Sequence, residues 1–146
     1  MVIETIRKIC LTLSAPSLTA GEAAAFIGEI VEDPGESLPI TVRPSDSAFS
    51  LAEVVRRFGT NEPSYVELSL SGTSTLSVRE LAEVFDKYTE LLRLHPSKST
   101  RIIFQDINLE EGPCNSAIIA EVKFAPGDER DIDRAAVTSV TVRRNI

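Results

Sequence analysis

Side chains able to do covalent or acid–base chemistry are scarce in this chain of 146 residues, which contains two cysteines and one histidine. A nucleophilic site would combine the thiol of Cys114 with His95 as the base and Asp106 to orient the imidazole. Spacing alone does not bring these side chains together, and His95 follows a predicted helix, where an imidazolium also caps free carbonyls. A small α+β enzyme or ligand-binding domain with a site near Cys114 and His95 is therefore kept as an alternative, and no catalytic residue is assigned.

Metal and phosphate sites lack the residue spacing that they need. Cys10 and Cys114 have 103 residues between them, so no paired zinc-ligand spacing exists. One acidic turn lacks the order of an EF-hand loop and is interleaved with Arg130 and Arg134. Its carboxylates are Asp128, Glu129, Asp131 and Asp133. The polar segment 71–75 lacks the second glycine and the lysine of a phosphate-binding loop. We therefore expect neither a metal nor a cofactor.

The distribution of charged residues is the most informative feature of the sequence. The chain has 15 Lys and Arg against 22 Asp and Glu, a net charge of −7, which argues against nucleic acid as a partner. Two stretches contain acids and no base at all. Between Lys8 and Arg43 lie Glu22, Glu29, Glu32, Asp33 and Glu36, and between Arg101 and Lys123 lie Asp106, Glu110, Glu111 and Glu121. If the two stretches meet, they form an acidic surface that attracts a basic partner.

We therefore predict a non-catalytic acidic domain that binds another protein, for example an inhibitor or immunity-type protein that neutralises a basic toxin. Tyr65 would supply an aromatic anchor. The predicted acidic contacts are Glu29, Glu32, Asp33, Glu36, Asp106, Glu110 and Glu111. Acidity also keeps a protein soluble without any partner, and a structural subunit of a larger assembly is a second alternative.

No membrane partner is expected, because the apolar runs are far shorter than the roughly 20 residues that cross a bilayer. Glu4, Arg7 and Lys8 are not followed by the long apolar run of a signal peptide. Two cysteines are too few for a disulfide framework, although the sequence allows a single disulfide between them. We expect a cytoplasmic protein with reduced thiols.

The predicted elements alternate along the first two thirds of the chain. Alternation over Ile9–Leu13 predicts a strand, and the capping boxes that begin at Thr19, Ser50 and Ser77 predict helices over residues 20–32, 51–58 and 77–93. Further alternating runs predict strands at residues 38–42, 66–70, 101–107, 116–124 and 136–143. The last of these strands would pair within the chain or across a homodimer. The tetrapeptide Leu-Ala-Glu-Val at 51–54 and 81–84 is best explained by chance.

The fold class that follows is α+β, with residues 1–146 as one two-layer domain. The order βαβαβα-βββ predicts a mixed sheet with three helices mainly on one face. Polar residues at the alternate strand positions predict that the other face is at least partly solvated.

Overall fold

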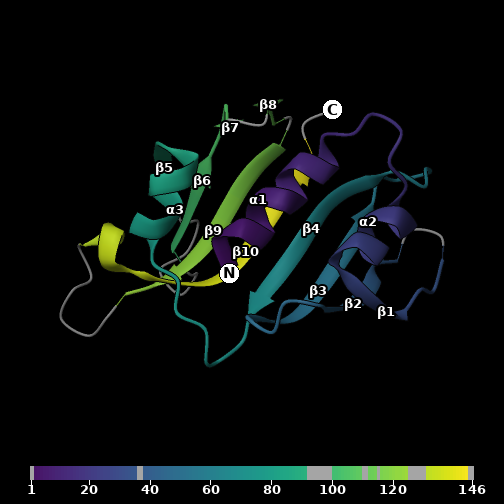
Figure 1. Ribbon diagram of the computed structural model, residues 1–146, viewed down its shortest axis with the longest axis horizontal. Coiled ribbons are helices and arrows are strands. Elements are labelled where there is room, and N and C mark those ends of the chain that lie inside the picture. The colour runs from purple at the N-terminus through teal and green to yellow at the C-terminus, as the bar shows by residue number, and fades with distance from the viewer. Residues whose placement is uncertain are drawn as a thin grey trace.

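Three α-helices, ten strands and one 3-10 helix are found in residues 2–35, 38–91, 100–109, 112–114, 116–124 and 131–144, which the computed structural model describes (Figure 1). The helices are α1 (Val2–Leu13), α2 (Ala20–Ile27), α3 (Val78–Phe85) and the 3-10 helix η1 (Ile132–Arg134). The strands are β1 (Gly28–Glu32), β2 (Ile40–Pro44), β3 (Phe49–Arg56), β4 (Pro63–Leu70), β5 (Tyr88–Leu91), β6 (Thr100–Phe104), β7 (Asn108–Leu109), β8 (Gly112–Pro113), β9 (Ser116–Lys123) and β10 (Ala136–Arg144).

Eight of the strands form one open sheet in the order β1-β2-β3-β4-β10-β9-β6-β5, and β7 and β8 form a separate two-stranded ladder. Every strand pair is antiparallel, so the sheet is not the mixed sheet that the sequence predicted. The C-terminal strand β10 lies in the centre, paired with β4 on one side and β9 on the other. Of the two pairings expected for this strand, the structure has the one within the chain, and among the described strands β1 and β5 lie at the edges of the sheet.

Alternate residues of a strand point to opposite faces of a sheet, and here one set is buried. These residues form a single core cluster with the buried side chains of α1, α2 and α3. Figure 1 shows α1 in front of β9 and β10 and α2 in front of β2 and β3. The strand residues of this core include Ile40, Val42, Ala52, Val54, Val66, Leu68, Ile102, Phe104, Ile118, Ala120, Val140 and Val142. The other set of alternate residues forms the second face of the sheet.

Two of the three predicted capping boxes are confirmed. The hydroxyl of Thr19 accepts a hydrogen bond from the Glu22 N–H at 3.1 Å, and the Glu22 carboxylate accepts one from the Thr19 N–H. Ser77 and Glu80 make the same reciprocal pair at the start of α3. Each pair satisfies backbone donors that a helix start leaves free. Both helices have eight residues and are shorter than predicted.

The prediction of a first strand at Ile9–Leu13 is wrong, because these residues lie in α1. Ile9 and Leu13 fit a period of two, but they also fit the helical spacing of the buried set Ile6, Ile9, Cys10 and Leu13. The prediction of a helix from Ser50 is also wrong, because the segment forms β3 with Ala52 and Val54 pointing into the core. In this segment the alternation of buried and exposed residues determines the structure, and the capping motif at Ser50 does not start a helix.

The remaining boundary errors occur where a helix changes directly into a strand. α2 ends at Ile27, and β1 follows from Gly28, where a Cβ would overlap the carbonyl of Arg43 on the neighbouring strand. α3 ends at Phe85, and Asp86 has a φ of 72°, which turns the chain into β5. The expected order βαβαβα-βββ is therefore replaced by ααββββ followed by α and the remaining strands.

The buried Arg144 joins the end of the chain to its first helix. Its side chain donates to the carbonyl of Leu13 at 2.9 Å and to that of Ala15 at 2.6 Å. Both acceptors lie at the C-terminal end of α1, where carbonyls lack helical partners and carry partial negative charge. The guanidinium therefore caps α1 from β10.

Replacing Arg144 with methionine should lower the free energy of unfolding by roughly 1.5–3 kcal/mol, because charged hydrogen bonds to two half-buried carbonyls are lost. The matched control is Arg143→Met, which removes the same charge from the exposed neighbouring position on the second face. Urea denaturation measures both variants. Equal stability of the two variants would contradict a capping role for Arg144.

Candidate functional site

The predicted acidic residues do not come together on one surface. Glu29 and Glu32 lie in the edge strand β1, with Asp33 directly after it, whereas Asp106 follows β6. Five strands separate β1 from β6, which is six strand spacings or roughly 29 Å. Glu36, Glu110 and Glu111 lie outside the described residues, as does His95. Of the predicted acids that the structure describes, Glu29, Glu32 and Asp33 therefore lie together at β1, and Asp106 lies apart from them.

Two of the acids at β1 already have basic partners. The carboxylate of Glu29 lies 3.7 Å from the Arg43 guanidinium, with both side chains well exposed. Asp33 lies 2.8 Å from the buried guanidinium of Arg56, and this hydrogen bond lowers the pKa of Asp33, with help from the Gly35 N–H. Arg56 also donates to the carbonyl of Leu38. Asp33 therefore helps to hold the connection between β1 and β2 and is less available to a partner.

Exposed apolar side chains collect around the same edge strand. Phe26 at the end of α2 is 51% exposed, Ile30 and Val31 in β1 are 39% and 55% exposed, and Leu38 just before β2 is 58% exposed. We call these four residues, together with Glu29 and Glu32, the β1 edge surface. The outer side of β1 has no strand partner in the described part of the chain, so its backbone N–H and C=O groups are open to pairing.

A row of acids runs from this edge across the second face. The strand registers place Glu32 opposite Thr41, Thr41 opposite Glu53, and Glu53 opposite Glu67. We call Glu32, Glu53 and Glu67 the acidic row. No ion pair joins any of the three to a base within the residues that the structure describes. Two like charges on directly opposite residues destabilise a strand pair, so the Glu53–Glu67 pair acts against folding.

Tyr65 lies on the same face as the acidic row. It is half-buried in β4, opposite Val55 on one side and Arg143 on the other, and two residues from Glu67. The exposed Leu51 of β3 lies on this face as well. The structure therefore brings Tyr65 close to Glu53 and Glu67 rather than to Asp106.

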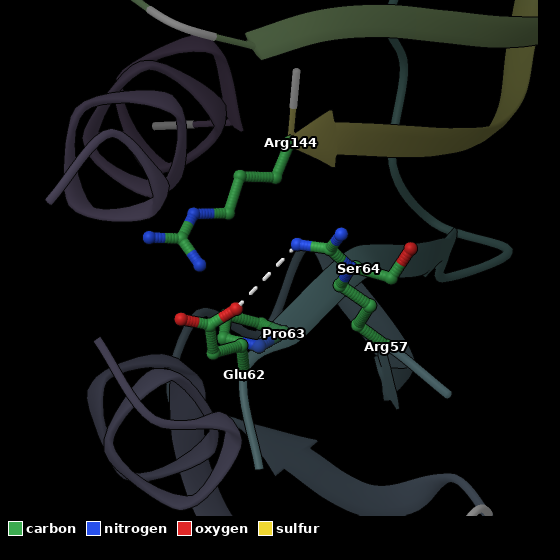
Figure 2. A pocket seen from close by; sticks show the side chains of 5 residues that line it. All are labelled: Arg57, Glu62, Pro63, Ser64 and Arg144. Atoms are coloured by element: carbon green, nitrogen blue, oxygen red, sulfur yellow. Dashed lines mark ion pairs between the residues drawn. The ribbon is translucent and has the colours of Figure 1, made fainter. Parts of the chain in front are cut away.

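The described pocket of about 140 Å³ lies where β4 begins and is lined by Arg57, Glu62, Pro63, Ser64 and Arg144 (Figure 2). Sites for drug-sized ligands usually measure about 300–1,000 Å³, so this pocket is small. Its two cations already have partners: Arg57 pairs with Glu62 at 3.8 Å, and Arg144 caps α1. It contains neither cysteine, so the pocket gives no support to the alternative of an enzyme site near Cys114.

The two cysteines are buried free thiols whose side chains interact. Cys10 belongs to α1, and Cys114 lies between β8 and β9, where its N–H donates to the carbonyl of Ile107 at 3.3 Å. Cys10 donates a hydrogen bond to Cys114. The Cys114 sulfur also lies 3.9 Å from the Ser14 hydroxyl and accepts hydrogen bonds from Ser116. We call Cys10, Ser14, Cys114 and Ser116 the thiol cluster.

The hydrogen bonds of the thiol cluster give the two cysteines opposite acidities. The hydrogen bond from Cys10, with smaller help from Ser14 and Ser116, lowers the pKa of Cys114 to about 6, although burial opposes this. The hydrogen bond to Cys114 and burial raise the pKa of Cys10. The hydrogen bonding therefore favours the thiolate form at Cys114 and the thiol form at Cys10. Asp106, the predicted orienting carboxylate, is exposed and takes no part in these contacts.

Comparison with family models, curated proteins and solved structures finds no match to this chain. In the described residues, no three His, Cys, Asp or Glu side chains are grouped so that they could hold a metal ion. No helix of the described residues is both long enough and apolar enough to cross a bilayer. The function therefore has to be argued from the surfaces and clusters described above.

Several residues of these sites were missed in the sequence for a common reason. Glu53 was assigned to a helix, and only the strand register places it beside Glu67. Ser14 follows Cys10 by four positions, a helical spacing that the predicted strand at Ile9–Leu13 does not use. The alternation of residues 66–70 did assign Glu67 to the polar side of its strand.

The rate at which iodoacetamide alkylates Cys114 should rise with pH around a midpoint near 6, because the thiolate is the reacting form. In Cys10→Ala the strongest hydrogen-bond donor is gone, so the midpoint should move to higher pH. Mass spectrometry of quenched samples gives both profiles, and in the wild type Cys10 serves as the internal control that stays unmodified. Identical midpoints in the two proteins would contradict the assigned role of Cys10.

Proposed function

We propose that this protein binds a basic protein partner through the β1 edge surface and the adjoining acidic row. The observation that carries the proposal is the exposure of Phe26, Ile30, Val31 and Leu38 around an edge strand whose outer side is unpaired. Exposed apolar groups beside polar ones are typical of protein-binding surfaces. An edge strand offers main-chain hydrogen bonds to a strand of the partner, and neighbouring side chains supply specificity.

Charge selects the kind of partner. If two copies of this chain paired through β1, Glu29 and Glu32 of each copy would lie against the same acids of the other copy. Like charges in contact disfavour such a pair. The bulge between Ile30 and Glu32 also interrupts regular pairing at this edge. A partner segment with Lys or Arg is attracted by these acids and not repelled, so a basic protein fits this surface better than a second copy.

The acidic row extends the contact from the edge onto the second face. Glu53 and Glu67 repel each other in the free protein, and a basic side chain between them would relieve that repulsion. Leu51 and Tyr65 offer apolar contacts on the same face. The ring of Tyr65 would serve as the aromatic anchor of the partner contact. The binding free energy then has an apolar part at β1 and an electrostatic part on the sheet.

The narrower form of this proposal is an inhibitor or immunity-type protein whose basic partner is a toxin. A toxin that acts on nucleic acid needs a basic phosphate-binding site, and an acidic protein can cover such a site. The cytoplasm would be the compartment in which both thiols stay reduced. No catalytic step belongs to this function.

Val31→Lys should weaken partner binding at least tenfold, about 1.4 kcal/mol, because it places a cation in the apolar part of the β1 edge surface. The matched control is Phe58→Lys, since Phe58 is 90% exposed in the turn between β3 and β4 and is not one of the residues of this surface. Capture at low salt identifies the partner, and calorimetry with the purified pair measures the variants. Equal losses in both variants, or no loss in Val31→Lys, would contradict binding through β1.

Glu53→Gln and Glu67→Gln should each leave the protein as stable as the wild type or stabilise it by about 0.2–1 kcal/mol, because the opposed charges are removed. The same variants should weaken binding of the basic partner, and added salt should reduce the difference from the wild type. Glu83→Gln on the exposed side of α3 is the control for net charge. A loss of stability in Glu53→Gln and Glu67→Gln would show that these carboxylates serve the fold instead.

A further inference from the structure

The thiol cluster has no part in partner binding, and it joins two segments that are distant in sequence. Cys10 lies in the last turns of α1, and Cys114 lies in the short connection between β8 and β9. Cys10 is completely buried, whereas Cys114 retains 8% exposure. The two segments meet at the cysteines: the Ser116 hydroxyl, two residues after Cys114, donates to the Cys10 carbonyl at 3.5 Å, and the two cysteine side chains interact. We propose that Cys10 and Cys114 form a reversible intrachain disulfide when a small hydroperoxide oxidises Cys114.

The polar groups around the sulfurs distinguish this pair from two inert core cysteines. The Ser14 hydroxyl lies 3.0 Å from the Cys10 carbonyl and 3.9 Å from the Cys114 sulfur, so its single proton can serve either acceptor. Ser116 is buried; its hydroxyl lies 3.5 Å from the Cys10 carbonyl as a donor, and its hydroxyl and N–H both favour the charged form of Cys114. Hydrogen-bond donors around a sulfur favour its thiolate, which is the form that attacks peroxides. The cluster therefore activates Cys114 and leaves Cys10 as a protonated neighbour.

The reaction takes place in two balanced steps with hydrogen peroxide as the oxidant. The Cys114 thiolate attacks one peroxide oxygen, the O–O bond breaks, and the products are a sulfenic acid and hydroxide. The sulfur of Cys10 then attacks the sulfur of Cys114, the S–O bond breaks, and the leaving hydroxide takes the Cys10 proton to form water. In total the two thiols lose two electrons and two protons, and one peroxide becomes two waters. A dithiol reductant reverses the change.

The positions of the two residues favour this order of events. Cys10 is held within a helix and its pKa is raised, so it does not react with peroxide by itself. Cys114 lies directly after β8 and retains some exposure, so a small peroxide reaches its sulfur before that of the completely buried Cys10. The burial of both sulfurs admits hydrogen peroxide more readily than a bulky disulfide such as oxidised glutathione.

The test uses the full-length reduced protein and hydrogen peroxide. After treatment, the protein is unfolded and free thiols are capped with N-ethylmaleimide before intact mass and peptide analysis. We expect a monomer that lacks two hydrogens, takes up no label and yields a Cys10–Cys114 linked peptide, with both labels regained after dithiothreitol. The same reaction in guanidinium-unfolded protein should be at least roughly tenfold slower, because the donors around Cys114 are lost.

Two variants assign the separate steps. Cys10→Ala should stop at a sulfenic acid on Cys114 that dimedone traps, and Cys114→Ala should leave Cys10 unmodified under the same conditions. The wild-type experiment decides the proposal even if a variant fails to fold. Two labelled thiols after peroxide treatment, a disulfide between chains, or a rate equal to that of the unfolded protein would overturn it. These outcomes do not depend on whether a protein partner binds at β1.

Discussion

The pairing of β10 with both β4 and β9 is the interaction on which the rest of the fold depends. Without β10, the strands β1 to β4 and the strands β5, β6 and β9 would be two separate groups with open edges at β4 and β9. β10 comes after the other described strands in the sequence, yet it lies between the two groups and joins them. Arg144 at the end of β10 then fixes α1, the first element of the chain, through the carbonyls of Leu13 and Ala15.

β10 also reveals a symmetry in the topology. Counted from the two edges, the strand orders are β1-β2-β3-β4 and β5-β6-β9-β10, and the two series meet at an antiparallel pair. Each series follows an eight-residue helix that begins with a capping box, α2 for the first and α3 for the second. The chain therefore has the plan of two similar units, each a short helix followed by four strands. The two-stranded ladder of β7 and β8 is an insertion in the second unit.

The sequence predicts the two capped helices and the later strands because these signals are local. A capping box needs only four residues, and the alternation of residues 116–124 and 136–143 is read from each strand alone. The repeated tetrapeptide is misleading in this respect: residues 51–54 lie in a strand and residues 81–84 in a helix. Identical residues take different structures because Ala52 and Val54 face the sheet core, whereas Leu81 packs from a helix.

The candidate sites could not be predicted in the same way, because each depends on residues brought together by pairing across the sheet. Glu53 and Glu67 become neighbours only through the register of β3 with β4. The contact between Cys10 and Cys114 needs α1 to lie against β9, which local pattern does not specify. Composition correctly marked acids as the unusual residue type, but their total of 22 says nothing about which of them share a face.

The thiol cluster and the β1 edge surface lie in different parts of the molecule, and the helices determine whether one can affect the other. α1 contacts β9, β10, α2 and α3, while α2 contacts β1, β2 and β3. The C-terminal end of α1 carries partial negative charge, which opposes a thiolate at Cys114, and Arg144 compensates by placing a cation on the same carbonyls.

A disulfide from α1 to the segment before β9 would restrain α1. From α1, the contacts with α2 lead to β1. Coupling between thiol state and partner affinity therefore requires α2 to shift with α1. If α2 stays fixed by its capping box and its contacts with three strands, oxidation and binding are independent properties of one sheet.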